Sequence, residues 1–212
     1  MVLIQGTGLV AVLVAALHHL YSVSHSPVAV YVALWAVFHL CEYTFTARYL
    51  PRTATKWLFL LFGAVGAGNL LVVHLASIAE HWITEKHFLP VWRAHSAAGL
   101  AIAASGIVIR ALAIKHCGNS FSHYIESEKP QKLVTNGIYA WCRHPSYLGF
   151  ILFFMGMQTV LGNVVVYAVS MVILFRFFRC RIRLEEIVLV HNMYEKEYEK
   201  YQERVSALIP FF

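Results

Sequence analysis

Long uncharged stretches separated by short polar segments dominate the chain. Residues 1–41 contain no Asp, Glu, Lys or Arg, and His25-Ser26-Pro27 divides this stretch in two. Two further uncharged stretches follow before the middle of the chain. A helix needs about 20 apolar residues to cross a bilayer. The pattern therefore predicts four membrane-spanning helices in residues 1–114, at about 2–23, 28–47, 57–79 and 94–109, the last of which can extend to Lys115.

A later uncharged stretch, between Arg143 and Arg176, is interrupted only by Gly162-Asn163. Gly-Asn is typical of a turn, so we expect a tight helical hairpin with arms at about 146–161 and 164–178. The prediction is an all-α integral membrane protein with about six transmembrane helices. Residues 115–212, which contain the hairpin, also carry most of the polar sequence.

Composition supports a membrane protein. Of 212 residues, 59% are apolar or aromatic and 13% are charged, whereas soluble domains average about 45–50% and about 25%. The net charge of +6 comes from basic residues placed between apolar stretches, which favours an anionic lipid surface over nucleic acid as partner. Segment 48–56 has three basic residues and no acidic one. We therefore expect it on the cytosolic side with 115–144 and the C-terminal tail, and a loop at 80–93 on the opposite side.

Cysteine and histidine spacing bears on possible metal and haem sites. The four cysteines form no CxxC pair, and the sequences around His116-Cys117 and Cys142 match no zinc-finger spacing, so we expect no metal. Histidines in or beside apolar helices could ligate haem, and this alternative involves His18, His39, His74 and His95. A non-catalytic membrane scaffold is another alternative.

Three polar groups lie at or inside the predicted helices. Arg143-His144-Pro145-Ser146-Tyr147 precedes the fifth helix, with Pro at a favoured first position and N–H groups that could hold a carboxylate; the alternative is a plain helix start with an interfacial Arg and Tyr. Arg181 and Glu185 are four residues apart, a spacing that also suits an ordinary ion pair. His39 and Glu42 share a face of the second helix, either for function or for a structural bond.

Small residues in the fourth predicted helix, Gly99, Ala103 and Gly106, predict that it packs closely against another helix.

The polar segments together resemble one family of membrane enzymes. The motifs are Gly118-Asn119-Ser120-Phe121-Ser122-His123, Leu133-Val134-Thr135-Asn136-Gly137-Ile138-Tyr139, and RHPSY with Gly149, followed by an Arg-rich helix with Glu185-Glu186. This combination resembles the isoprenylcysteine carboxyl methyltransferases over residues 115–208, with a weaker likeness at Phe38-His39-x-x-Glu42-Tyr43. RHPxYxG alone also occurs in phospholipid methyltransferases and some sterol reductases.

The resemblance implies a methyl donor, an acceptor and a set of contacts. The donor is S-adenosylmethionine, which leaves as S-adenosylhomocysteine, and the acceptor is the carboxylate of a farnesylated or geranylgeranylated C-terminal cysteine in CaaX-processed proteins such as small GTPases. Residues 115–212 become the catalytic region, facing the cytosol from the endoplasmic reticulum membrane. Arg181 holds the substrate carboxylate and Glu185 acts with it. The implied cofactor contacts are Glu126, Gln131, Lys132, Leu133, Val134, Tyr139, His144, Pro145, Ser146, Tyr147 and Glu185.

The chemistry suits these residue types. A carboxylate is already ionised at neutral pH (pKa about 3.5), so methyl transfer to it needs no general base. The site must supply orientation and a dry environment, and a guanidinium can grip a carboxylate with two hydrogen bonds. Tyr139, Trp141 and Tyr147 could face the donor's sulfonium, although an interfacial position is the better interpretation for Trp141. The alternative acceptor is a phospholipid or small amine.

Overall fold

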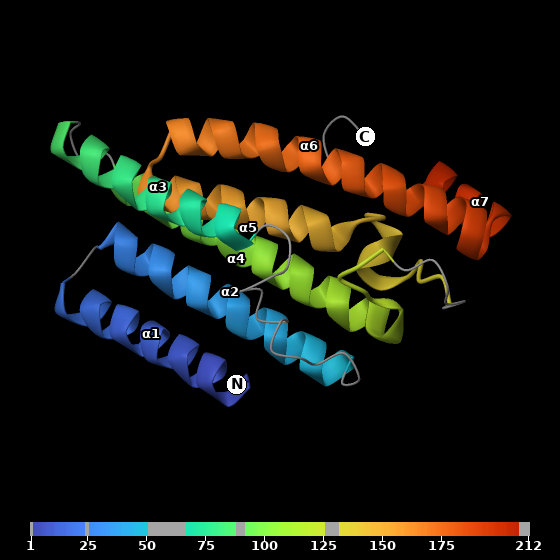
Figure 1. Ribbon diagram of the computed structural model, residues 1–212, viewed down its shortest axis with the longest axis horizontal. Coiled ribbons are helices and arrows are strands. Elements are labelled where there is room, and N and C mark those ends of the chain that lie inside the picture. Colours follow the sequence, from blue (N-terminus) through green and yellow to red (C-terminus); the bar gives the residue numbers. More distant parts are fainter. Residues whose placement is uncertain (1, 24–25, 51–66, 88–91, 126–131, 208–212) are drawn as a thin grey trace.

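The protein is an all-helical bundle in the residues that the computed structural model describes, which are 2–23, 26–50, 67–87, 92–125 and 132–207. The long helices lie roughly along one axis, with α3, α4 and α5 between α1 and α2 on one side and α6 on the other (Figure 1). They are α1 (Val2–Ser22), α2 (Pro27–Tyr49), α3 (Ala67–His87), α4 (Trp92–Cys117), α5 (Pro145–Leu161) and α6 (Val165–Val188), followed by α7 (Lys196–Arg204).

Glycines bring α4 and α5 into close antiparallel contact, as the small residues of the fourth helix predicted. A Cβ added to Gly106 would lie 2.3 Å from the backbone nitrogen of Phe153, and one added to Gly156 would lie 2.3 Å from that of Ala103. Real side chains do not tolerate such distances, so these positions require glycine for the helix backbones to approach. The α4–α5 pair is the centre on which α2, α3 and α6 pack, and α1 packs on α2.

Aromatic packing attaches the neighbouring helices to this centre. The rings of Phe38 on α2 and Phe153 on α5 are stacked, with centroids 4.2 Å apart, beside the buried Met157. On the other side, Phe178 and Ile182 of α6 pack against Ile151 of α5. In a bilayer, where lipid tails are as apolar as these side chains, close van der Waals packing is what stabilises such contacts.

Helices α1, α2 and the hairpin α5–α6 lie where the sequence predicts them. Ser26 caps α2 by accepting a hydrogen bond from the Ala29 N–H at 3.3 Å, and Pro27 follows at the first helical position. The predicted turn is confirmed, since Gly162 ends α5 in the left-handed conformation with φ of 69°.

The predicted third helix and the loop after it require correction. Helix α3 spans Ala67–His87 and so ends eight residues after the predicted end at residue 79; residues 57–66 of the predicted helix lie outside the described part. The expected loop at 80–93 is therefore helical up to His87. Glu80 explains the difference, because its carboxylate accepts the N–H groups of Val164 and Val165 at 2.8 Å and of Val166 at 2.7 Å. This charge caps the start of α6 instead of facing solvent in a loop.

Helix α6 continues well beyond its predicted end, whereas α4 takes the longer of its two predicted lengths. Helix α4 runs past Arg110 to Cys117, two residues beyond the Lys115 to which the prediction let it extend, because Arg110 is buried and its charge is paired within the protein. Helix α6 continues past residue 178 to Val188, then forms a π-helical turn at Leu189–Tyr194 before α7. The hairpin arm and the Arg-rich helix are thus one element.

Within the described residues, two segments, Pro27–Tyr49 and His95–Ser120, are long and apolar enough to cross a membrane by length and composition. Helix α5 is a shorter apolar helix of 17 residues. Both segments and α5 pack together at the centre of the bundle.

Candidate functional site

A large cavity opens where α4 ends and α5 begins. Its volume is about 950 Å³, at the upper end of the range typical of small-molecule sites. Charged and hydroxyl-bearing side chains line one part of it, including His144, Tyr147, Arg181 and Glu185. Side chains of Val73, Phe150, Phe154, Ile173, Leu174 and Phe177 line another part. The cavity therefore has a polar end and an apolar arm.

The start of α5 forms one wall of the polar end. His144 occupies the position before the helix and Pro145 is the first helical residue. The His144 carbonyl accepts the N–H groups of Tyr147 and Leu148 at 3.1 Å each. Two of the first-turn N–H groups that could hold a carboxylate thus already have an acceptor within the protein.

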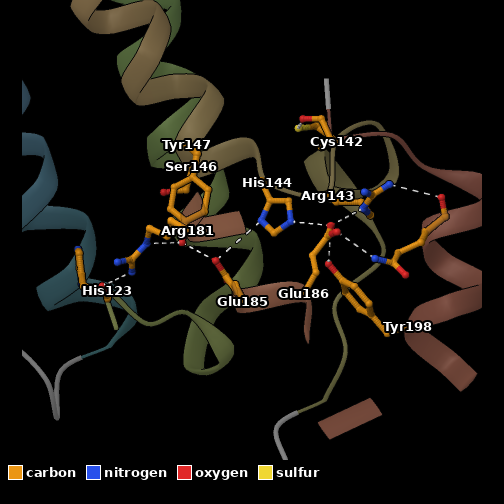
Figure 2. A network of polar contacts seen from close by, with 12 residues as sticks. His123, Cys142, Arg143, His144, Ser146, Tyr147, Arg181, Glu185, Glu186 and Tyr198 are labelled. Carbon is orange, nitrogen blue, oxygen red and sulfur yellow. Dashed lines mark hydrogen bonds and ion pairs between the residues drawn. The ribbon is translucent and has the colours of Figure 1, made fainter. Parts of the chain in front are cut away.

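Tyr147 links Arg181 and Glu185 across the polar end (Figure 2). The Arg181 Nε donates to the Tyr147 hydroxyl at 2.9 Å, and that hydroxyl donates to Glu185 Oε2 at 2.5 Å. The Arg181 guanidinium also lies over the Tyr147 ring, 5.6 Å from its centroid. The four-residue spacing places Arg181 and Glu185 on one face of α6, as predicted, but a tyrosine of α5 joins them in place of a direct ion pair.

Part of this group's hydrogen-bonding capacity is unused. A guanidinium has five N–H donors, and within the described ranges Arg181 uses one on Nε and one on Nη2, the latter to the His123 carbonyl at 2.7 Å. For Glu185, Tyr147 and His144 approach Oε2, and no described residue contacts Oε1. Donors and a carboxylate oxygen therefore remain available to a molecule in the cavity.

A second set of contacts behind this one orients His144. His144 Nε2 lies 2.9 Å from Glu186 Oε1, and Arg143 Nε donates to the same oxygen at 2.9 Å. Gln202 of α7 donates to Glu186 Oε2 at 3.0 Å. Burial raises the pKa of Glu186, but hydrogen bonds and positive charge from His144 and Arg143 outweigh it, so that the pKa lies below its usual value. The glutamate is thus an ionised anchor that ties α7 to the start of α5.

Glu42 and Arg110 form a buried ion pair beside the cavity. Arg110 Nε lies 2.5 Å from Glu42 Oε2 and Nη2 lies 2.7 Å from Oε1. His123 Nε2 lies 2.7 Å from Glu42 Oε1, and Arg110 Nη1 donates to the Ser146 hydroxyl at 2.9 Å. Of the two interpretations of Glu42, a structural bond is the one that these contacts support. The sequence analysis missed Arg110, whose only signal was an isolated charge continuing an apolar helix.

Other predicted contacts fall on the segment between α4 and α5. Lys132, Leu133, Val134 and Tyr139 line the cavity, as do Pro145 and Ser146. The Tyr139 hydroxyl donates to the Ala113 carbonyl at 3.4 Å, and burial raises the pKa of Tyr139 well above its usual value. It is therefore a neutral phenol. Glu126 and Gln131 lie outside the described residues.

Of the residues with a predicted interfacial or metal role, Cys117 lines the cavity, whereas Trp141, His116 and Cys142 do not. Trp141 is 79% exposed and does not line the cavity. The His116 Nδ1 accepts the Ile138 N–H at 3.1 Å, and the Cys142 thiol donates to the Ala207 carbonyl at 3.0 Å. Among the described residues, no three His, Cys, Asp or Glu side chains converge as a metal site would need.

The fold and site define an all-helical protein of membrane type with a two-part cavity at one end, and comparisons with known proteins agree. The profile of the isoprenylcysteine carboxyl methyltransferase (ICMT) family matches residues 99–191. The chain is 36% identical over 191 residues to the protein-S-isoprenylcysteine O-methyltransferase of Rattus norvegicus, covering 85% of this chain and 64% of the relative. It is 32% identical to that of Saccharomyces cerevisiae over 187 residues, covering 83% and 76%.

The structural comparison agrees as well. A solved structure of the eukaryotic intramembrane Ras methyltransferase ICMT superposes with a TM-score of 0.89 at 30% identity, covering 98% of this chain and 75% of that one. The chain belongs to the isoprenylcysteine carboxyl methyltransferase family, a family of membrane proteins. It spans about two thirds of the length of the rat and mouse relatives, at 64%.

Proposed function

We propose that the protein methylates the C-terminal carboxylate of prenylated cysteine with S-adenosylmethionine as donor. The observation that carries this proposal is the two-part cavity, because such a substrate also has two parts. A carboxylate and a cysteine form its polar end, and a farnesyl or geranylgeranyl chain forms its apolar end. The names of the similar proteins describe O-methyl transfer to protein isoprenylcysteine, which supports the proposal.

The apolar arm suits a prenyl chain that arrives from the lipid. Phe150 and Phe154 of α5 line its inner side, and Ile173 and Phe177 of α6 line its outer side. Ile173 and Phe177 are themselves exposed on the bundle surface, so the arm reaches the face of α6 that lipid would cover. A prenyl chain can enter from the side while its cysteine remains at the polar end.

The polar end fits the donor by its chemistry. Glu185 Oε1 can accept the donor's ammonium group, while Tyr139 and Tyr147 offer aromatic faces to its adenine or sulfonium. Lys132, Leu133 and Val134 would hold the donor from the loop side, and His144, Pro145 and Ser146 from the start of α5. When bound, S-adenosylmethionine supplies an electrophilic methyl group. Glu126 and Gln131 belong to this proposed set by resemblance alone.

Arg181 is the proposed residue for the substrate carboxylate. The acceptor is ionised at neutral pH, so no side chain needs to remove a proton. Arg181 keeps donors on Nη1 and Nη2 beyond those already used, and Tyr147 and the His123 carbonyl fix its orientation. It therefore positions the nucleophilic oxygen, while the buried Glu42–Arg110 pair keeps the neighbouring segment in place. Exclusion of water from the cavity strengthens the hydrogen bonds between Arg181 and the substrate carboxylate.

The topology and location follow from the same proposal. We place about six transmembrane helices in the bilayer of the endoplasmic reticulum, with residues 115–144 and α7 on the cytosolic side. Processed CaaX proteins such as small GTPases would reach the enzyme from the cytosolic side. The basic segment 48–56 supports this orientation.

Transfer of tritiated methyl groups tests the proposal. The purified protein, reconstituted in lipid, receives labelled S-adenosylmethionine with N-acetyl-S-farnesylcysteine, unprenylated N-acetylcysteine or phosphatidylethanolamine as parallel acceptors. We expect base-labile label on the farnesylated compound alone. Label on the phospholipid would contradict the proposed acceptor while keeping the donor site, and no transfer to any acceptor would contradict the proposal as a whole.

A further inference from the structure

Helix α6 carries an outward row of arginines that the catalytic proposal does not use. Arg176, Arg179 and Arg183 recur at intervals of three and four residues, the spacing of one helix face. All three are exposed. Arg181, between them in sequence, points the other way and bonds Tyr147 inside the bundle. The row is therefore separate from the cavity.

The apolar part of the same helix face leads directly into this row. Val165, Val169 and Val172 precede Arg176 at the same three- and four-residue spacing and are 66%, 55% and 60% exposed. No other described element covers these valines, so a bilayer would have to. The face thus changes from apolar to cationic at Arg176, which is the order of hydrocarbon and headgroup layers in a membrane.

The charges of the row are not neutralised within the protein. In the part of the chain with described coordinates, no hydrogen bond or ion pair engages these three guanidinium groups. The nearest acidic residues on α6 are committed elsewhere, Glu185 to Tyr147 and Glu186 to Arg143 and His144. Arg179 and Arg183, four residues apart, repel each other. An external anion would relieve this repulsion.

We infer that Arg176, Arg179 and Arg183 form a binding site for the phosphate group of anionic phospholipids on the outer face of α6. A guanidinium binds phosphate oxygens with paired, charge-assisted hydrogen bonds. The row extends for about 10 Å along the helix axis at about 1.5 Å per residue, and a long arginine side chain can reach along the helix to the headgroup layer. The inference does not depend on the methyl-transfer proposal, because it concerns the opposite face of the helix.

Energy transfer to labelled lipid tests the inference. The full-length protein is placed in phosphatidylcholine nanodiscs with a small fraction of dansyl-labelled phosphatidylglycerol or dansyl-labelled phosphatidylcholine, and transfer from its tryptophans is measured. We expect a preference for phosphatidylglycerol that falls roughly five-fold for each arginine replaced by glutamine. The triple change Arg176→Gln/Arg179→Gln/Arg183→Gln should abolish it. Raising the salt to about 1 M, where the Debye length is about 3 Å, should weaken it in the unmodified protein.

A matched variant controls for net charge. The triple change Lys196→Gln/Lys200→Gln/Arg204→Gln removes the same charge from exposed positions of α7 and should keep the preference. The single change Arg179→Gln serves if the triple variant does not fold, and a cooperative thermal unfolding transition in detergent reports folding independently. Equal loss in both triple variants would overturn the inference. A preference for phosphatidylglycerol that survives the α6 substitutions would also overturn the inference.

Discussion

A group of polar side chains lies at each end of α5, and the two groups use their hydrogen-bonding capacity differently. At the hairpin end, Gln158, Ser77 and Asn163 bond one another at 2.8–3.1 Å, and Glu80 caps three N–H groups of α6. One buried oxygen there, Asn163 Oδ1, has no partner among the described residues. At the other end, donors of Arg181 and an oxygen of Glu185 remain unused beside a large cavity.

This difference separates structural polar residues from functional ones. A buried polar group without a partner costs about 1–3 kcal/mol, so a protein normally pairs such groups completely. Arg181 and Glu185 are only half-buried, so their unused groups face the cavity, where water can meet them until a ligand binds. We therefore expect substitutions at the hairpin end to change stability, and substitutions around Tyr147 to change binding and turnover.

The largest expected effect belongs to the buried pair beside the cavity. Arg110→Met would leave Glu42 Oε2 without its 2.5 Å partner at a residue only 3% exposed. Removing one member of a buried ion pair costs about 3–5 kcal/mol. The free energy of unfolding in detergent should fall by this amount. The double change Arg110→Met/Glu42→Leu, which removes both charges, should recover much of the loss, and an unaffected single variant would contradict the structural role.

A smaller effect, on turnover, is expected for Tyr147→Phe. The substitution removes the hydroxyl that joins Arg181 to Glu185 but keeps the ring, which is stacked on His144 with an interplanar angle of 4°. Loss of a hydrogen bond to a charged group costs about 1.5–3 kcal/mol, or roughly 10- to 150-fold in kcat/KM. Steady-state kinetics measures this fall in kcat/KM. If kcat/KM is unchanged while the melting temperature drops, Tyr147 belongs with the structural group.

At the hairpin end, Glu80→Ala should destabilise the protein without impairing catalysis. The carboxylate accepts three N–H groups at the start of α6, and loss of a helix cap costs about 0.5–2 kcal/mol. Thermal unfolding measures this, and the turnover per folded molecule should remain that of the unmodified protein. Glu85→Ala, on the exposed side of the same helix, is the control and should leave both quantities unchanged.

The smallest effect concerns pH and Glu186. Its pKa is lowered in the folded state, so the stability it contributes is present above its unfolded pKa of about 4.3. That contribution is lost as the pH falls through the lowered folded value. Melting temperatures measured from about pH 6 to about pH 3 should therefore fall less for Glu186→Gln than for the unmodified protein. Parallel curves would show that Glu186 does not anchor α7 through its charge.

Local sequence signals predicted much of the fold. The Ser-Pro start of α2, the Gly-Asn turn and the small residues of α4 each indicate an element whose cause lies within a few residues, and all three are confirmed. The predicted end of α3 was wrong because Glu80 was placed in a loop, and the end of α4 was left open between residues 109 and 115, on either side of Arg110. The partners of Glu80 and Arg110 are 84 and 68 residues away, and a spacing rule cannot find such pairs.

In the candidate site too, features with a local cause could be predicted, and features that depend on packing between distant segments could not. Short motifs found the start of α5 and the face of α6 that carries Arg181 and Glu185, because each motif lies on one helix. That Tyr147 joins them depends on how α5 packs against α6, through Phe178 and Ile151. The π-helical turn at Leu189–Tyr194, which brings Tyr194 to the cavity wall, carries no sequence signal that we could identify.

One substitution tests the central claim, which is that unused donors of Arg181 hold the substrate carboxylate. Arg181→Lys keeps the charge but loses the planar pair of donors. The measurement is the dissociation constant of S-adenosylmethionine together with kcat and KM for N-acetyl-S-farnesylcysteine. The account predicts an unchanged dissociation constant and a fall in kcat/KM of at least about ten-fold, or about 1.4 kcal/mol. Normal kcat/KM, or a loss explained entirely by weaker donor binding, would contradict it.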